Sequence, residues 1–143
     1  MSKNCMSDME IAMSRLAVSN VVLCGNGKVI ERTERGILPL LKLIKTGEDF
    51  SGFSAADKII GKAAALLFLK MGICEVFGEV MSIAAQHVFK KSGVHYKFQT
   101  LAEKIINRAG TGRCPMEEAV AITDDPDIAY QIILETYKKL FEE

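Results

Sequence analysis

Lys58 and Lys62 are the residues whose type and spacing point most directly to chemistry. They stand four positions apart within residues 55–70, a stretch whose pattern predicts one helix. On one face of a helix their like charges repel, and the helix dipole disfavours cations in the first two turns, at a cost of roughly 0.3–0.5 kcal/mol for each effect. Both effects become favourable when an anion lies in front of the helix. We therefore predict a site for phosphate or another anion at this helix start.

Two neighbouring residues would complete this site. Gly61 lets a ligand or a neighbouring backbone approach closely, at a cost of about 1 kcal/mol of helix stability relative to alanine. Asp57 lies three residues after Ser54, as the acidic member of a capping box does. The simpler alternative is that the lysines extend into solvent over apolar neighbours, that Asp57 neutralises them, and that Gly61 serves close helix packing.

A second group of unusual residues lies in the segment 107–118, NRAGTGRCPMEE. Two glycines supply conformational freedom and free backbone amides, and two arginines beside them can grip carboxylate or phosphate oxygens. The spacing differs from that of a Walker motif. The residues expected to wrap an anion here are Arg108, Gly110, Thr111, Gly112 and Arg113.

Cys114 is the candidate nucleophile of the chain. It is predicted to be the N-cap of a helix, where the dipole and the preceding arginine lower a thiol pKa. A catalytic cysteine needs a positioned base, and the histidines available are His87 and His95. Nothing in the sequence brings either of them to Cys114, so the alternative is an inert cap. Glu117 and Glu118 fall in the first turn, where acidic residues are expected for helix stability alone.

The remaining pattern places these residues in an α/β domain. Helix and strand signals alternate along the middle of the chain, so crossover connections are required, and the strands there should be parallel and covered on both faces. We expect a three-layer α/β/α sandwich around a mixed sheet. The predicted elements are a helix at 8–17, a hairpin at 20–24 and 28–33, a helix at 37–45, a helix at 55–70, a strand at 73–80, a helix at 82–91, a strand at 94–98, a short helix at 100–108 and helices beginning at 115 and 126.

The composition is that of a single cytoplasmic domain spanning residues 1–143, with residues 1–14 loosely ordered. Eighteen acidic residues balance eighteen basic ones, so no global field attracts nucleic acid or an anionic membrane. The N-terminus lacks a signal-peptide pattern, and the longest apolar stretch, residues 63–69, is too short to span a bilayer. Four scattered cysteines form neither a zinc motif nor a disulfide framework and fit reduced thiols.

Two segments of the chain resemble a small uncharacterised prokaryotic family with a cytidine-deaminase-like fold. They read ADKIIGKAAALL and INRAGTGRCPMEEAV, the latter followed by DDP, and the resemblance covers roughly residues 15–141. It implies a three-layer α/β/α fold with a hairpin entering the sheet. Zinc deaminases open one helix with H-x-E and the next with P-C-x-x-C. The matching helix starts here read AADK and SIAA, so neither zinc nor zinc-dependent deamination is expected.

Three functions remain open on this basis. The first is a module that binds a nucleotide-like or phosphorylated anion at the start of helix 55–70, without a further cofactor, where the resemblance places the deaminase-like pocket. The second is a metal-independent enzyme that uses Cys114 or Asp57, and the third is a homo-oligomeric structural or interaction protein, a homodimer in its simplest form. The predicted ligand-binding residues are Asp57, Lys58, Gly61, Lys62, Arg108, Gly110, Thr111, Gly112, Arg113 and Cys114.

Overall fold

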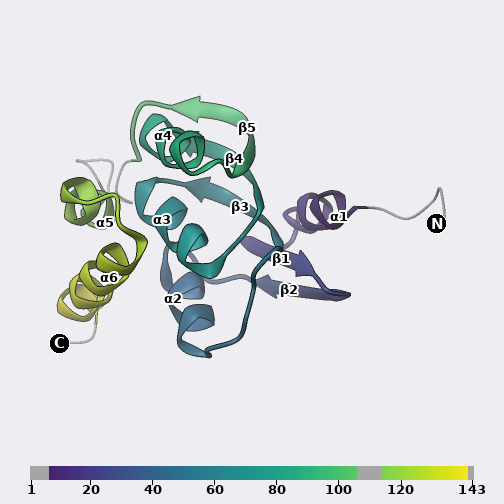
Figure 1. The fold of residues 1–143 in the computed structure, drawn as a ribbon, viewed down its shortest axis with the longest axis horizontal. Helices are drawn as coiled ribbons and strands as arrows, with labels where there is room; N and C mark the ends of the chain where they lie inside the picture. The colour runs from purple at the N-terminus through teal and green to yellow at the C-terminus, as the bar shows by residue number, and fades with distance from the viewer. Residues whose placement is uncertain (1–6, 106–113, 142–143) are drawn as a thin grey trace.

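A five-stranded mixed sheet forms the centre of the computed structural model, which describes residues 7–105 and 114–141 (Figure 1). β1 is antiparallel to both of its neighbours, β2 and β3, whereas β3, β4 and β5 run parallel to one another. Parallel neighbours need crossover connections, and a helix supplies each of the two here. In spatial order the strands are β2 (Lys28–Arg32), β1 (Val21–Gly25), β3 (Ser54–Ile60), β4 (Glu75–Ser82) and β5 (His95–Ala102).

The predicted N-terminal hairpin is confirmed. Asn26 and Gly27 connect β1 to β2, with φ angles of 49° and 76°. Positive φ at both central residues is what a two-residue turn between twisted antiparallel strands requires, and Asn-Gly is the sequence that best accepts it. The turn fixes the register, with Gly25 opposite Lys28.

Helices cover the two faces of the sheet unequally (Figure 1). On one face α1 places Ala12 against Val22 and Ala56 of the sheet. On the other face α2, α3 and α4 form the larger core, which includes Leu23 and Val76. Outside the sheet α5 and α6 lie beside α3, and together these layers make the predicted three-layer α/β/α sandwich. The helices are α1 (Asp8–Arg15), α2 (Leu38–Lys45), α3 (Lys62–Met71), α4 (Ile83–Ser92), α5 (Pro115–Ala119) and α6 (Pro126–Phe141), with a 3-10 turn, η1 (Val120–Ile122), before α6.

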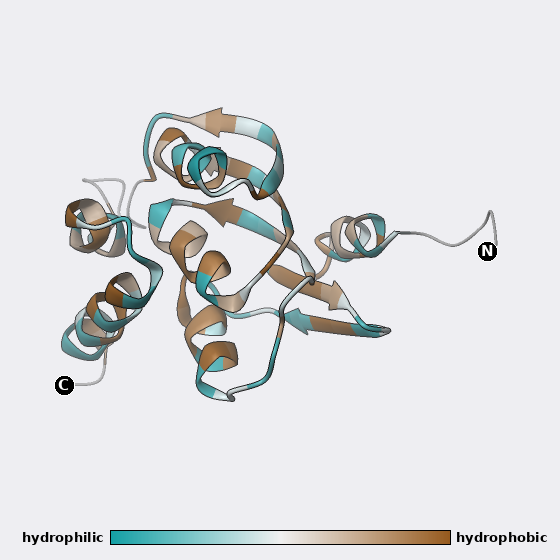
Figure 2. Ribbon diagram, viewed as in Figure 1, coloured by the Kyte–Doolittle hydropathy of each residue, from teal (hydrophilic) through white to brown (hydrophobic). Residues whose placement is uncertain are grey.

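The central helix is α3, and Figure 2 shows it to be largely hydrophobic. Its residues from Ala63 to Phe68 are all buried, because α2, α4, α5 and α6 pack around it. An all-round apolar helix is the type that a protein buries at its centre. The helix ends at Gly72 with φ 80°, as its sequence predicts.

The predicted helix at 55–70 is wrong in its first part, because residues 54–60 form β3. Alanine favours a helix locally, but this segment finds strand partners on both sides, with Val21 opposite Asp57 and Phe77 opposite Ala56. Ser54 caps no helix and instead donates its hydroxyl hydrogen to Glu75 (2.6 Å). Residues 58 and 62 therefore belong to different elements, and their like charges do not share one helix face.

The predicted short helix at 100–108 is wrong over its described part. β5 continues to Ala102, with Thr100 opposite Val80 and Leu101 opposite Met81. The spacing of Thr100 and Glu103 imitates a capping box, but the neighbouring strand offers the backbone a ladder of hydrogen bonds instead. Of the segment 1–14, residues 8–14 belong to α1, which packs on the sheet. Within the described ranges no helix is long and apolar enough to cross a membrane.

Candidate functional site

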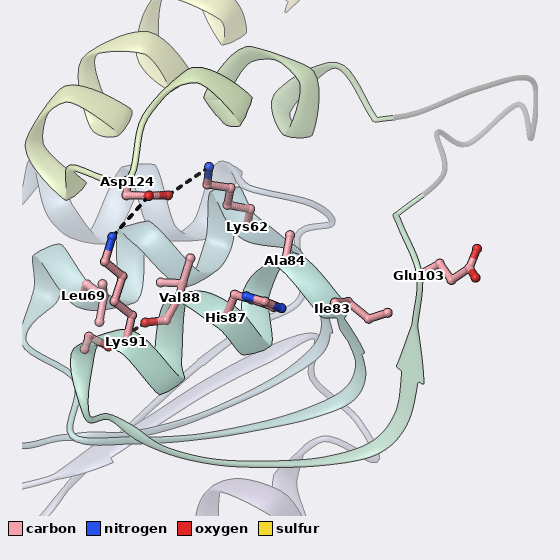
Figure 3. Close-up of a pocket in the computed structure, with 10 residues that line it drawn as sticks. Lys62, Leu69, Ile83, Ala84, His87, Val88, Lys91, Glu103 and Asp124 are labelled. Atoms are coloured by element: carbon pink, nitrogen blue, oxygen red, sulfur yellow. Dashed lines mark hydrogen bonds and ion pairs between the residues drawn. The ribbon is translucent and has the colours of Figure 1, made fainter.

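A groove of about 940 Å³ opens where the parallel strands end and runs along α4 (Figure 3). Three of its residues lie just beyond the carboxyl ends of neighbouring strands: Lys62 comes two residues after β3, Ile83 follows β4, and Glu103 follows β5. In open α/β sheets this edge is the usual place for ligands. The groove is lined by Lys62, Leu69, Ile83, Ala84, His87, Val88, Lys91, Ser92, Glu103 and Asp124.

One carboxylate in the groove is shared between two lysines. Asp124 lies 3.1 Å from the Lys62 Nζ through one oxygen and 3.5 Å from the Lys91 Nζ through the other. The hydrogen bond and charge of Lys62, followed by the charge of Lys91, hold the Asp124 pKa below its usual value. Lys62 and Lys91 thus face one carboxylate at this end of the groove, while Glu103 supplies the other carboxylate of its lining.

The two lysines reach Asp124 from different helices. Lys62 begins α3, and its side chain is only 14% exposed, so its position is set by the surrounding structure. Lys91 comes from the last turn of α4, and His87 lies one turn earlier on the same face of that helix. Figure 3 shows the His87 ring beside Val88 and Ala84 in the wall of the groove. The groove thus combines a cationic end with an apolar wall.

The start of α3 already holds an anion, which is the carboxylate of Glu117 from α5. Its two oxygens accept the backbone N–H groups of Lys62 (2.7 Å) and Ala63 (2.8 Å). Glu117 is 6% exposed and lies against Gly61, where an added Cβ would come within 2.5 Å of the Glu117 Cδ. The anion in front of this helix is therefore a side chain of the chain itself and not the phosphate or other ligand anion that the sequence predicted. The expectation that Gly61 makes room for a ligand is wrong, because Gly61 makes room for Glu117.

Glu117 is the residue that sequence reasoning undervalued. Its place in the first turn of α5 gives a carboxylate a sufficient local explanation. The sequence carries one signal for a structural role. Gly61 precedes α3 and has no side chain to cap it, so the first N–H groups of α3 need an acceptor from elsewhere. A sequence does not state which of eighteen acidic residues supplies that acceptor.

Asp57 and Lys58 lie in the middle of the sheet and do not line the groove. Asp57 stands opposite Val21 on β1 and Gly78 on β4. Burial raises the Asp57 pKa to about 7, although the backbone N–H groups of Ile59 and Lys58 act in the opposite direction. Lys58 donates its own N–H to the carbonyl of Asn20 (3.1 Å). Among the described residues predicted to bind a ligand, Lys62 is the one that the structure places in the groove.

Cys114 is the N-cap of α5 in position, but its side chain makes no capping hydrogen bond. The residue is partly buried and packs against the main core, and it is not among the residues that line the groove with His87. His95 opens β5 at the amino end of the parallel strands, whereas α5 meets the start of α3 at their carboxyl end. The described geometry therefore pairs neither histidine with this thiol. The predicted residues Arg108, Gly110, Thr111, Gly112 and Arg113 lie outside the described part of the chain.

The described thiols Cys24, Cys74 and Cys114 are all free. Across residues 7–105 and 114–141, no three His, Cys, Asp or Glu side chains come together as metal ligands would. Burial raises the Cys24 pKa to about 11, and a hydrogen bond to Asp8 acts in the same direction. Cys24 is therefore a protonated thiol at neutral pH.

These features define an α/β domain with a mixed sheet, a groove at the carboxyl ends of its parallel strands and a helix start capped by a distant glutamate. The chain belongs to the family described as a domain of unknown function, DUF1893, whose model matches residues 10–137. The crystal structure of a DUF1893 family protein from Thermotoga maritima is similar over 92% of both chains, with a TM-score of 0.81 and 22% sequence identity. At that identity the likeness shows the fold alone. No curated protein matches the chain significantly.

The family match confirms the predicted membership of a small uncharacterised family. The further link to a cytidine-deaminase-like fold stays a prediction.

Proposed function

We propose that the groove along α4 binds a small nucleotide-like or phosphorylated anion. The observation that carries this proposal is the placement of Asp124 between Lys62 and Lys91, where two cations from different helices share one mostly exposed carboxylate. A phosphate group carries a charge of about −1.5 to −2 and three terminal oxygens, so it satisfies two ammonium groups better than one singly charged carboxylate does. In this proposal the binding site lies beside the start of α3, because Glu117 fills the start itself.

The apolar wall of the groove supports a ligand with a flat or hydrophobic portion. Ile83, Ala84, Val88 and Leu69 line this wall, and Ile83 is 39% exposed at its entrance. Small-molecule sites typically have volumes of roughly 300–1,000 Å³ and combine apolar walls with a few polar groups. A nucleoside monophosphate has both parts in one molecule, a phosphate for the lysines and a base for the wall.

Binding in this proposal proceeds by exchange of anions. Asp124 is 60% exposed and lies in the connection between η1 and α6, so turning it toward solvent breaks few contacts. Lys62 is held in place by its burial. The ligand anion then takes the place of the Asp124 carboxylate, while His87 lies within the same wall.

The test is a calorimetric titration of the full chain with AMP, CMP, GMP and UMP in turn. Lys62→Met and Lys91→Met each remove one ammonium group and should weaken binding by tenfold or more. Asp124→Asn removes the resident carboxylate and should strengthen binding several-fold, because the incoming anion no longer competes with it. Lys90→Met is the matched control, since Lys90 is exposed on the same helix but does not line the groove.

General charge attraction predicts the same signs for the lysine and aspartate variants, so the comparison of Lys91→Met with Lys90→Met is the one that distinguishes a local site from it. If all four nucleotides fail to bind, or if Lys90→Met weakens binding as much as Lys91→Met, the proposal is wrong. Parallel titrations with inorganic phosphate and with adenosine show which half of the ligand supplies the affinity.

An enzyme without a metal is the second candidate function, and the raised pKa of Asp57 is the observation that favours it. A carboxyl group with a pKa of about 7 is matched to general acid or base catalysis near neutral pH. Cys114 is the alternative reactive group. Chromatography of a nucleotide incubated with the chain tests for turnover, and loss of that turnover in Asp57→Asn or Cys114→Ala identifies the group involved. If chromatography shows the nucleotide unchanged, the chain does not convert it, and binding remains the proposed function.

The free thiols also support a cytoplasmic location, which is part of this proposal. Reduced cysteines are usual where glutathione and thioredoxin systems operate. Fractionation of cells followed by immunodetection of the chain tests this directly.

A further inference from the structure

The charged side chains that line the groove in the described part of the chain balance one another. Lys62 and Lys91 bring two positive charges, and Glu103 and Asp124 bring two negative ones. The titratable residue that completes this lining is His87, and histidine is the side chain that ordinarily gains or loses its charge between pH 5 and pH 8. The described lining is therefore neutral overall with a neutral imidazole and positive with a protonated one.

His87 lies on the face of α4 that forms the wall of the groove. It stands one turn before Lys91, and residues in this relation have Cβ atoms about 5–6 Å apart on one helix face. Figure 3 shows its ring beside Val88 and Ala84. The imidazole and the Lys91 side chain thus start from adjacent positions on the wall, so one anion in the groove can contact both.

The His87 ring is available to such an anion. The residue is exposed. The side-chain hydrogen bonds of α4 and its N-cap that join described residues are made by Ser82, Gln86 and Ser92. Both lysines of the groove already face Asp124, at 3.1 Å and 3.5 Å, so they exchange one anion for another when a ligand binds. The imidazole instead gains a partner without giving up one among the described residues.

We infer that His87 makes anion binding in this groove stronger as the pH falls, an inference that rests on the function proposed above. In its protonated form the imidazole donates an N–H to the third terminal oxygen of a phosphate group, whose other two oxygens face Lys62 and Lys91. Hydrogen bonds between charged partners are roughly twice as strong as those between neutral ones. In its neutral form the imidazole adds no charge, and the four charged side chains of the lining balance.

The charged groups around His87 keep their charges over the range in which histidine titrates. They come from α3, from α4, from the end of β5 and from the connection before α6, and β4 contributes no charged side chain to the described lining. These groups are Lys62, Lys90, Lys91, Glu103 and Asp124. Lysine and carboxylate side chains ordinarily stay ionised between pH 6 and pH 8. The Asp124 pKa is held below its usual value by its two lysines, so this carboxylate remains a competitor of the ligand throughout.

Calorimetric titration of the full chain and of His87→Gln with AMP, CMP, GMP and UMP at pH 6 and pH 8 tests the inference. Glutamine keeps a hydrogen-bond donor but cannot take up the proton. The Kd of His87→Gln should exceed that of the unmodified chain about fivefold at pH 6, the effect of one charged hydrogen bond at an exposed site, and should equal it at pH 8. Titration of the nucleotide phosphate and of Asp57 is common to both chains, so it cancels in this ratio.

His95→Gln is the matched control, because His95 is also exposed but opens β5 at the amino end of the parallel strands. Its Kd should equal that of the unmodified chain at both pH values. A ratio for His87→Gln that exceeds one but does not change with pH would mean that the ring packs on the ligand, and it would overturn the inference. A ratio of one at both pH values would do the same, and either result leaves the proposed function intact. If none of the nucleotides binds at either pH, the proposed function and this inference are both wrong.

Discussion

At the start of α3 a carboxylate from a different helix serves as the N-cap. Gly61 has no side chain to offer, and Glu117 reaches across to bond the first two N–H groups of the helix. This contact joins α3, the most buried helix, to α5. The place at this helix start where a ligand anion was expected is thus filled by Glu117, whose role is structural.

Removal of this carboxylate should be costly. Glu117→Ala leaves two backbone N–H groups at a buried helix start without an acceptor, and we expect a loss of about 2–3 kcal/mol in the free energy of unfolding. Urea denaturation monitored by circular dichroism measures it. Glu118→Ala removes an exposed carboxylate from the same turn and should change stability by less than about 0.5 kcal/mol. Equal effects of the two variants would contradict the capping role.

Asp57 should make stability depend on pH in an unusual direction. Its pKa in the folded chain, about 7, lies above the ordinary 3.8, so the folded state keeps its proton over a range in which the unfolded state has lost it. The free energy of unfolding therefore falls as pH rises through this window, and the loss is complete above pH 7. Asp57→Asn should be nearly neutral near pH 4 and stabilising by up to about 4 kcal/mol at pH 8.

Thermal unfolding of both chains from pH 4 to pH 8 checks this prediction. Asp49→Asn is the matched control, because a hydrogen bond from Ser51 lowers the Asp49 pKa on the exposed surface. That variant should give no stabilisation at pH 8. A flat difference between Asp57→Asn and the unmodified chain across the range would show that residue 57 is ionised in both states.

At the scale of elements, sequence reasoning identified the segments whose signals are local. The Asn-Gly turn, the apolar body of α3, its terminal Gly72 and the proline at the start of α5 each act within a few residues. The prediction for the residues of β3 was wrong because their structure depends on contacts that are distant in the sequence. Its SAADKII segment has alanine and a lysine, which favour helix locally, and only pairing with β1 and β4 makes it a strand.

The candidate site was less predictable because its residues meet only through the fold. Lys62 was identified for its charge at a helix start, but Lys91, His87 and Asp124 lie 25 to 62 positions further along the chain. Their meeting depends on α4 lying beside α3 and on the connection that leads into α6. No spacing rule within one segment indicates that arrangement.

The junction between β3 and α3 allows a prediction about coupling. Gly61 has φ −98°, which any residue adopts, so Gly61→Ala acts through space rather than through backbone strain. Its new Cβ would displace Glu117, and we expect a loss of about 2 kcal/mol. In a Glu117→Ala background the same change should cost less than about 1 kcal/mol, since the obstructing carboxylate is absent.

A double-mutant cycle measured by urea denaturation gives this coupling energy. Additive losses would mean that Gly61 is required for another reason. The cycle uses two substitutions at one contact, so its result does not depend on the function proposed for the groove.

At the scale of the whole molecule, the sheet determines where the groove lies, because Lys62, Ile83 and Glu103 all follow the carboxyl ends of its parallel strands. The balanced net charge leaves this surface without a strong global field. Recognition there then depends on a few local charges, which explains why single substitutions are expected to have clear effects.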